Sequence, residues 1–129
     1  MNVTARPKIA IIIESDYAVA NVVEAVLREW KYDVVVTQTH RRAVIEAQAF
    51  PNVHLLAACV PCADDEQLGA YLAHARATQQ RKMAVVLMLG DNVDDAVEAP
   101  EFSQRLYKPF GREQLIEALY LAEWKALEV

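Results

Sequence analysis

The chain has 129 residues, of which 54% are hydrophobic and 24% are charged, as expected for one globular domain with a substantial core. The formal net charge of −5 disfavours a protein that binds the phosphate backbone of nucleic acids, because such binding needs a basic surface. The amino-terminal apolar run covers only residues 9–13, too short for a signal peptide or a membrane helix. We therefore expect a cytoplasmic protein with no nucleic-acid or membrane partner and with its two cysteines reduced.

The first half of the chain alternates apolar runs with amphipathic segments. Apolar runs of strand length occur at residues 8–13, 33–37 and 53–58. Valines and leucines at helical spacing predict a helix over about residues 17–29, capped by Ser15 or Asp16. A weaker helix is predicted over residues 41–49 and is stopped before Pro51.

The second half repeats this alternation. Strands are predicted at residues 83–89 and 104–107, and helices at residues 65–79 and 112–127. The acidic segment 93–102 contains Pro100 and gives at most a short helix. Five apolar strands that alternate with helices form a parallel sheet with helices on both faces. We expect a single domain over residues 1–129, with its core at about residues 8–127.

Residues that can bind a ligand or react chemically follow four of the predicted strands. In a doubly wound sheet, ligands bind at the carboxyl ends of the strands, where the winding reverses. The candidate segments are residues 14–16, 57–62, 89–91 and 107–109. The second contains Cys59 and Cys62 in the C-x-x-C spacing of a thiol redox centre or half a metal site. The sequence has no second cysteine pair and no histidines at ligand spacing, so we expect no metal site.

These segments resemble the receiver domain of bacterial response regulators (CheY-like). The most specific stretch is "YKPFGREQLIEAL" (107–119), because Lys-Pro-Phe followed by a helix that opens with Glu and Leu is strongly typical of that family. "PNVHLLAACVPCADDEQL" (51–68) looks like the segment around the family's phosphorylated aspartate, and "IIESD" (12–16) like its acidic turn. The resemblance extends from about Lys8 to Leu127. It implies a flavodoxin-like fold with strand order 2-1-3-4-5 and a role in two-component signal transduction.

A working receiver needs five groups at these strand ends. An aspartate accepts a phosphoryl group, and two acids hold the Mg²⁺ that neutralises charge during the transfer. A lysine pairs with the phosphate, and a Ser or Thr couples phosphorylation to a conformational change. The resemblance places Ala57 at the phosphoacceptor, Glu14 and Ser15 at the two acids with Asp16 beside them, Leu89 at the hydroxyl and Lys108 at the lysine.

The residues at these positions cannot carry out the family's chemistry. Ala57 has no nucleophile, Ser15 lacks the second carboxylate, and Leu89 lacks a hydroxyl group. We therefore predict a stand-alone degenerate receiver, or pseudo-receiver, that is not an enzyme and has no catalytic residue, cofactor or metal. Its expected function is phosphorylation-independent protein–protein interaction in a phosphorelay pathway, with a signalling kinase or regulator as partner.

Two other functions stay open at this point. A non-standard acid, Asp64 or Asp65, is a candidate phosphoacceptor, although both lie well beyond the third strand. Alternatively, Cys59 and Cys62 are the reactive pair of a thiol redox sensor.

The final helix has two apolar stripes. One stripe faces the sheet and consists of Leu115, Ala118, Leu119, Ala122 and Ala126. The second stripe consists of Ile116, Tyr120, Trp124 and Leu127. It either packs against segment 93–102 or forms a protein interface, since Tyr and Trp are enriched in interface cores. In the second case a homodimer through this helix is one expected assembly.

Lys108, which the resemblance places at the family's lysine, raises a separate question about charge. Without phosphate or metal, the ammonium group of Lys108 needs another counter-charge, and Glu14 is the nearest candidate, with Asp16 second. We predict a Glu14–Lys108 ion pair that contributes at most about 1 kcal/mol if it lies near the surface. The resemblance also implies a cis peptide bond before Pro109.

Overall fold

The computed structural model describes residues 8–49, 53–60, 83–90 and 103–128. The elements, in chain order, are β1 (Lys8–Ile13), α1 (Tyr17–Glu29), β2 (Tyr32–Thr37), α2 (His40–Ala49), β3 (Val53–Val60), β4 (Ala84–Leu89), β5 (Ser103–Tyr107) and α4 (Arg112–Glu128). The predicted helices over 65–79 and within 93–102 lie outside the described residues.

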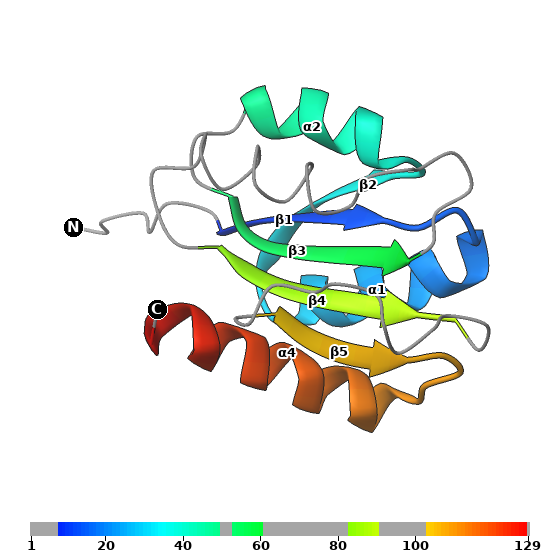
Figure 1. The fold of residues 1–129 in the computed structure, drawn as a ribbon, viewed down its shortest axis with the longest axis vertical. Coiled ribbons are helices and arrows are strands. Elements are labelled where there is room, and N and C mark those ends of the chain that lie inside the picture. Colours follow the sequence, from blue (N-terminus) through cyan, green and yellow to red (C-terminus); the bar gives the residue numbers. More distant parts are fainter. Residues whose placement is uncertain (1–7, 50–52, 61–82, 91–102, 129) are drawn as a thin grey trace.

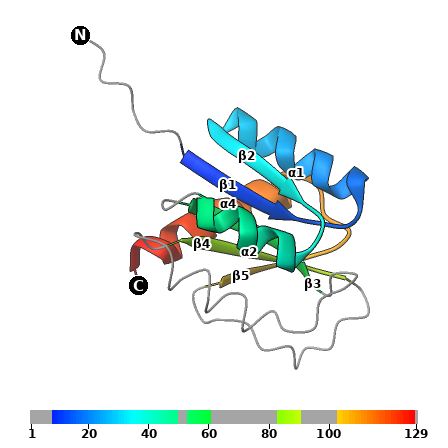
Figure 2. The same cartoon turned by 90° about the horizontal axis from the view of Figure 1, so that it is seen from above.

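The strands form one five-stranded sheet in the order β2-β1-β3-β4-β5, and all neighbouring pairs are parallel (Figure 1). Helices α1 and α4 contact each other on one side of the sheet, and α2 lies on the other side (Figure 2). The strand order and the two helical layers confirm the predicted doubly wound fold. The central strands β1, β3 and β4 are largely buried on both faces, which explains their mostly apolar sequences, whereas the edge strands β2 and β5 are partly exposed.

Strand β3 is longer than the sequence predicted. The prediction ended it at Ala58, but the strand continues through Val60. Cys59 pairs with Met88 and Val60 pairs with Leu89, so the ladder with β4 is complete to the end of β4. Because this segment holds no charged residue, nothing in it favours an earlier end of the strand.

The core is centred on β1, β3 and β4. Every residue of β4 is buried, and the isoleucines at the end of β1 are at most 1% exposed. On the α1 side, Val23 and Leu27 pack into this core together with Leu115 and Leu119 of α4. The sheet-facing stripe predicted for the final helix is therefore confirmed.

Polar contacts fix how the helices begin and where they lie. Oδ1 of Asp16 accepts hydrogen bonds from the backbone N–H groups of Ala18 (2.9 Å) and Val19 (3.4 Å), so Asp16 rather than Ser15 caps α1. The hydroxyl of Tyr32 at the start of β2 donates a hydrogen bond to Oε1 of Glu123 in α4, at 2.5 Å. These contacts add direction to the non-directional packing of the core.

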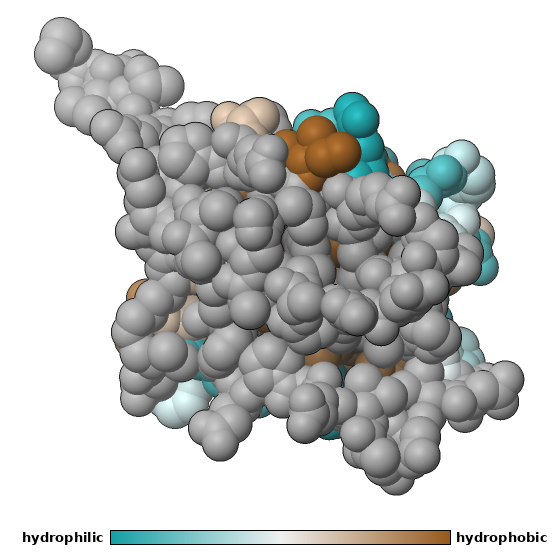
Figure 3. All heavy atoms as spheres, turned by 45° about the horizontal axis from the view of Figure 1, so that its top comes forward, coloured by the Kyte–Doolittle hydropathy of each residue, from teal (hydrophilic) through white to brown (hydrophobic). Residues whose placement is uncertain are grey.

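At the top of the view in Figure 3, described hydrophobic residues lie directly next to hydrophilic ones. Ile45 of α2 is half exposed. None of the described helices is long and apolar enough to cross a membrane.

Helix α4 offers a matched test of this packing. Leu119 is fully buried, whereas Leu127 on the same helix is 77% exposed. Leu119→Ala should lower the free energy of unfolding by about 3 kcal/mol because it leaves a cavity in the core. Leu127→Ala should change it by less than about 0.5 kcal/mol. Urea unfolding monitored by circular dichroism measures both values, and equal losses would contradict the described orientation of α4.

Candidate functional site

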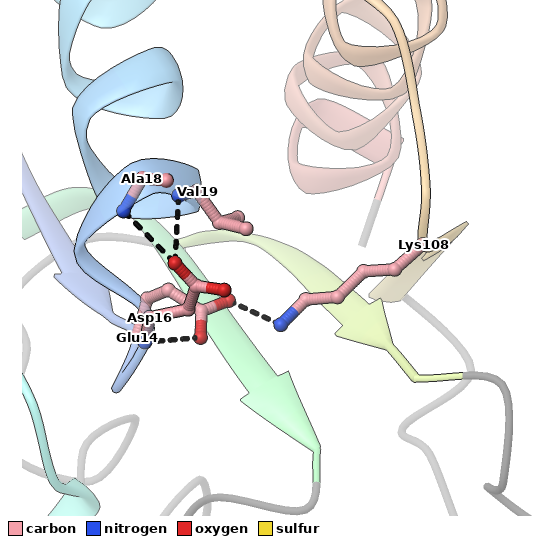
Figure 4. A network of polar contacts seen from close by, with 5 residues as sticks. All are labelled: Glu14, Asp16, Ala18, Val19 and Lys108. Atoms are coloured by element: carbon pink, nitrogen blue, oxygen red, sulfur yellow. Dashed lines mark hydrogen bonds and ion pairs between the residues drawn. The ribbon is translucent and has the colours of Figure 1, made fainter.

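The carboxyl ends of the strands bring an acid and a base together. Glu14 follows β1 and Lys108 follows β5, and strands β3 and β4 lie between β1 and β5 in the sheet. The side chain of Lys108 extends toward Glu14, so that its Nζ lies 2.5 Å from Oε1 of Glu14 (Figure 4). The predicted Glu14–Lys108 ion pair is therefore confirmed.

Burial makes this ion pair different from the near-surface pair that was expected. The Glu14 side chain is only 2% exposed and that of Lys108 is 25% exposed. Oε2 of Glu14 accepts a hydrogen bond from the backbone N–H of Asp16 at 3.1 Å. Oε1 accepts no regular hydrogen bond from the described residues, so the Lys108 ammonium is its counter-charge there. Removing the lysine would leave a buried, uncompensated carboxylate, which costs far more than the loss of a surface pair.

The backbone on each side of the pair is held by the sheet. The N–H of Lys108 donates to the carbonyl of Leu89 at 2.8 Å, and the N–H of Glu14 donates to the carbonyl of Thr37 at 3.0 Å. The hydroxyl of Thr37 is itself buried and donates to the carbonyl of Ile12 at 2.8 Å. The Lys108–Pro109 peptide bond is cis, as the resemblance implied.

The position expected for a phosphoacceptor lies inside the sheet. Ala57 is fully buried, and its partners in the ladders are Ile12 on β1 and Val86 on β4. Leu89, at the position of the switch hydroxyl, is 1% exposed. Neither side chain can accept a phosphoryl group or hydrogen-bond to one.

The acidic turn does not present a set of ligands that fits Mg²⁺. This ion prefers several oxygen ligands in octahedral geometry, usually including carboxylates. Glu14 is engaged by Lys108 and by the backbone of Asp16, and the Asp16 carboxylate caps α1 (Figure 4). Ser15 is exposed and offers only a neutral hydroxyl. In the part of the chain that the structure describes, no three His, Cys, Asp or Glu residues gather in a metal-binding cluster.

The other candidate residues do not belong to the Glu14–Lys108 ion pair or lie outside the described residues. Cys59 is buried, with 1% of its surface exposed. Its proposed redox partner Cys62, and the alternative acceptors Asp64 and Asp65, lie outside the described residues. The redox and alternative-acceptor hypotheses thus stay untested by the geometry.

The second stripe of the final helix divides into two parts. Tyr120, Trp124 and Leu127 are 66%, 56% and 77% exposed, so they do not join the core. Segment 93–102, the other expected neighbour of this stripe, lies outside the described residues. Ile116 is half-buried and packs against the core. The exposed part is therefore smaller than the predicted interface by one residue.

Sequence reasoning missed a groove between β5 and α4. It has a volume of about 350 Å³, and its walls include Tyr107, Phe110, Gln114, Glu117 and Leu121. The aromatic residues on either side of Lys108-Pro109 were a local signal for it. Tyr107 and Phe110 line the same groove because α4 packs along β5, and the residue pattern alone does not predict that packing.

Comparisons with known proteins agree with this architecture. No protein-family model matches the sequence, and no curated protein matches it. The structure is similar to a response regulator receiver protein from Sinorhizobium medicae WSM419, with 17% identity, a TM-score of 0.75 and coverage of 93% of this chain and 98% of that one.

Two further solved structures are similar to this chain. One is a CheY-like response regulator receiver domain protein from Methanospirillum hungatei JF-1, with 14% identity, a TM-score of 0.73 and coverage of 95% and 98% of the two chains. The other is the receiver domain of the hybrid histidine kinase CckA, with 20% identity, a TM-score of 0.72 and coverage of 89% and 98%. At these identities the likeness establishes the fold, and that fold is the flavodoxin-like fold of receiver domains.

The ion pair is testable by a double-mutant cycle. Lys108→Met should lower the free energy of unfolding by about 3 kcal/mol, because Glu14 then keeps a buried charge without its partner. Adding Glu14→Gln should restore most of that loss, because the buried charge is removed as well. Urea unfolding of the four proteins in the cycle gives the coupling energy. A coupling energy near zero would contradict the described contact.

Proposed function

We propose that this protein is a receiver-like signalling module that has lost phosphoryl transfer and acts by protein–protein interaction. The single observation that carries the proposal is the Glu14–Lys108 ion pair, formed beside a buried Ala57 at the acceptor position. A receiver lysine is expected to meet a phosphoryl group that arrives and leaves. Here a carboxylate of the same chain supplies that negative charge permanently.

An internal counter-charge has a direct consequence for regulation. In a phosphorylation switch, the new negative charge reorganises the groups that pair with it. In this chain the lysine is already paired and the position of the switch hydroxyl holds a buried leucine, Leu89. The pocket therefore has one electrostatic arrangement, and the domain acts as a binding module with a fixed conformation rather than as an enzyme.

The fold supports a cytoplasmic role in a two-component or phosphorelay pathway. One similar structure is itself the receiver domain of a hybrid histidine kinase. We propose that the partner is a protein of such a pathway, a kinase or a regulator, whose access to other components changes when this domain binds it. Such binding requires neither a metal nor a cofactor.

The proposal predicts how the chain responds to phosphodonors. Incubation with acetyl phosphate and Mg²⁺ should leave the intact mass unchanged, because Ala57 offers no nucleophile. Ala57→Asp alone should not restore full phosphorylation, because Ser15 supplies no second carboxylate and Glu14 is held by Lys108. The variant that combines Ala57→Asp with Ser15→Asp supplies both the acceptor and the second carboxylate. It is the matched control for restored metal binding.

Mass spectrometry separates the outcomes of this experiment. A phosphoryl group on the unmodified chain, mapped to Asp64 or Asp65, would show that the domain is a receiver with a non-standard acceptor. A two-proton mass loss under mild oxidant, mapped to a Cys59–Cys62 disulfide, would favour the thiol sensor. Either result would overturn the proposed function.

A further inference from the structure

Strand β2 forms one margin of the sheet (Figure 1). It pairs with β1 along its whole length, and among the described residues no strand lies on its other side. Helices α1 and α2 contact β2 from the two opposite faces of the sheet (Figure 2). A helix on a face of a sheet does not continue its ladder of hydrogen bonds, so the outer edge of β2 stays open to another strand.

The ladder with β1 determines which backbone groups of β2 point outward. The carbonyl of Thr37 accepts a hydrogen bond from the N–H of Glu14, so Thr37 is turned toward β1. Backbone groups alternate in direction along a strand, so Val35 is also turned toward β1, whereas Val34 and Val36 are turned away from it. Within the described ranges, the outward N–H and C=O groups of Val34 and Val36 have no backbone partner.

The sequence of β2 does not protect this edge. Sheets usually protect an edge strand with lysine, proline or a bulge. Strand β2 (YDVVVT) contains no lysine and no proline, and its register with β1 has no shift. Its one charged residue is Asp33, and it ends in four β-branched residues, which favour extended structure. Val36 is 40% exposed. An edge with these properties is a template for a further strand.

We infer that the outer edge of β2 pairs with β2 of a second copy of this chain. The two strands run antiparallel about a two-fold axis at Val35, and the two sheets join into one. In this register Val34 of one copy lies opposite Val36 of the other, and each such pair exchanges two backbone hydrogen bonds. The two Val35 residues form a non-hydrogen-bonded pair, because their backbone groups are turned to their own β1. The two-fold contact thus satisfies the outward groups of both copies.

Asp33 selects this register. With the axis at Val35, the Asp33 carboxylate lies opposite Thr37 of the other copy, so charges of like sign do not face each other. An axis at Val34 would place Asp33 against Val35 of the other copy, and an axis at Asp33 would oppose the two carboxylates. Both arrangements are unfavourable for a charged side chain. An axis nearer either end of β2 would pair fewer residues.

Helix α1 brings no net charge to the contact. Its Glu29 forms an ion pair with Arg112 of α4, so this flank of α1 faces the middle of the sheet. At 100° per residue, Glu24 and Arg28 lie on the opposite flank, which faces the β2 margin. Nη2 of Arg28 lies 2.8 Å from Oε2 of Glu24, so these two charges compensate each other. The α1 helices of two joined copies can therefore approach without repulsion between net charges.

Sedimentation of the whole chain tests the contact. The parent chain should form a dimer whose population rises with concentration. Val36→Lys should weaken dimerisation at least about tenfold, because it places a charge beside Val34 of the other copy. The matched control is Val22→Lys on α1, since Val22 is similarly exposed (47% against 40%) but lies on the flank that faces α4. This control should dimerise like the parent chain.

Disulfide trapping tests the register. In a non-hydrogen-bonded antiparallel pair the Cα atoms lie about 4.5 Å apart, a separation that a disulfide can span. Val35→Cys should therefore form a covalent dimer under mild oxidation, with the bond mapped by mass spectrometry to position 35 of both copies. Asp33→Cys should not, because its two copies would lie four residues apart along the ladder, or about 14 Å.

Three results would overturn the inference. The first is a parent chain that stays monomeric up to about 1 mM. The second is a dimer that Val36→Lys leaves intact, or that Val36→Lys and Val22→Lys weaken equally. The third is trapping at position 33 that equals or exceeds trapping at position 35. Circular dichroism melts verify that the variants are folded, and the trapping result decides if Val36→Lys does not fold.

The proposed contact goes beyond the proposed function and does not depend on it. Strands β2 and β5 are the two opposite margins of the sheet, so pairing through β2 does not cover the β5 margin of either copy. The phosphodonor experiment reports on the pocket of Glu14 and Lys108 and does not involve the dimer. A failure of the dimer prediction is therefore distinguishable from a failure of the proposed function.

Discussion

The ion pair between Glu14 and Lys108 is the interaction on which the functional edge of this domain depends. A carboxylate that is 2% exposed is unfavourable in a protein interior unless a counter-charge accompanies it. Lys108 provides that charge from beyond β5, and in doing so it connects the first strand of the fold to the last connection before α4. The same contact engages the two residues that the family resemblance places at the metal and phosphate positions. The proposed loss of phosphotransfer and the stability of this edge of the sheet would then share one physical origin.

Much of the fold was predictable because its signals are local. Apolar runs of strand length and a clear helical period placed every described element to within about two residues, which is the usual uncertainty of element boundaries. The predicted end of β3 was wrong because Ala58, Cys59 and Val60 are compatible with either a strand or a loop. The pairing of β3 with β4 decides between these two conformations. The choice of Asp16 over Ser15 as cap also depended on geometry, since both residue types are good caps.

The residues of the site were predictable from the sequence, but their burial was not. The family resemblance identified Glu14 and Lys108, and the need for a counter-charge predicted their contact. The depth of Glu14 followed from packing across β3 and β4, which no local pattern contains. Ile116 shows the same limit. Its position at the margin of the buried face allows it to turn inward, whereas Tyr120 and Trp124, nearer the centre of the outer face, are exposed.

The hydrogen bond between Tyr32 and Glu123 has a consequence for the kinetics of recognition. It joins residues 91 positions apart in the chain and ties the later turns of α4 to the start of β2. A protein that bound the exposed side chains of Tyr120, Trp124 and Leu127 would therefore meet a segment that is already ordered, and this domain would lose little conformational entropy on association. Its association rate would then not be limited by the ordering of this domain.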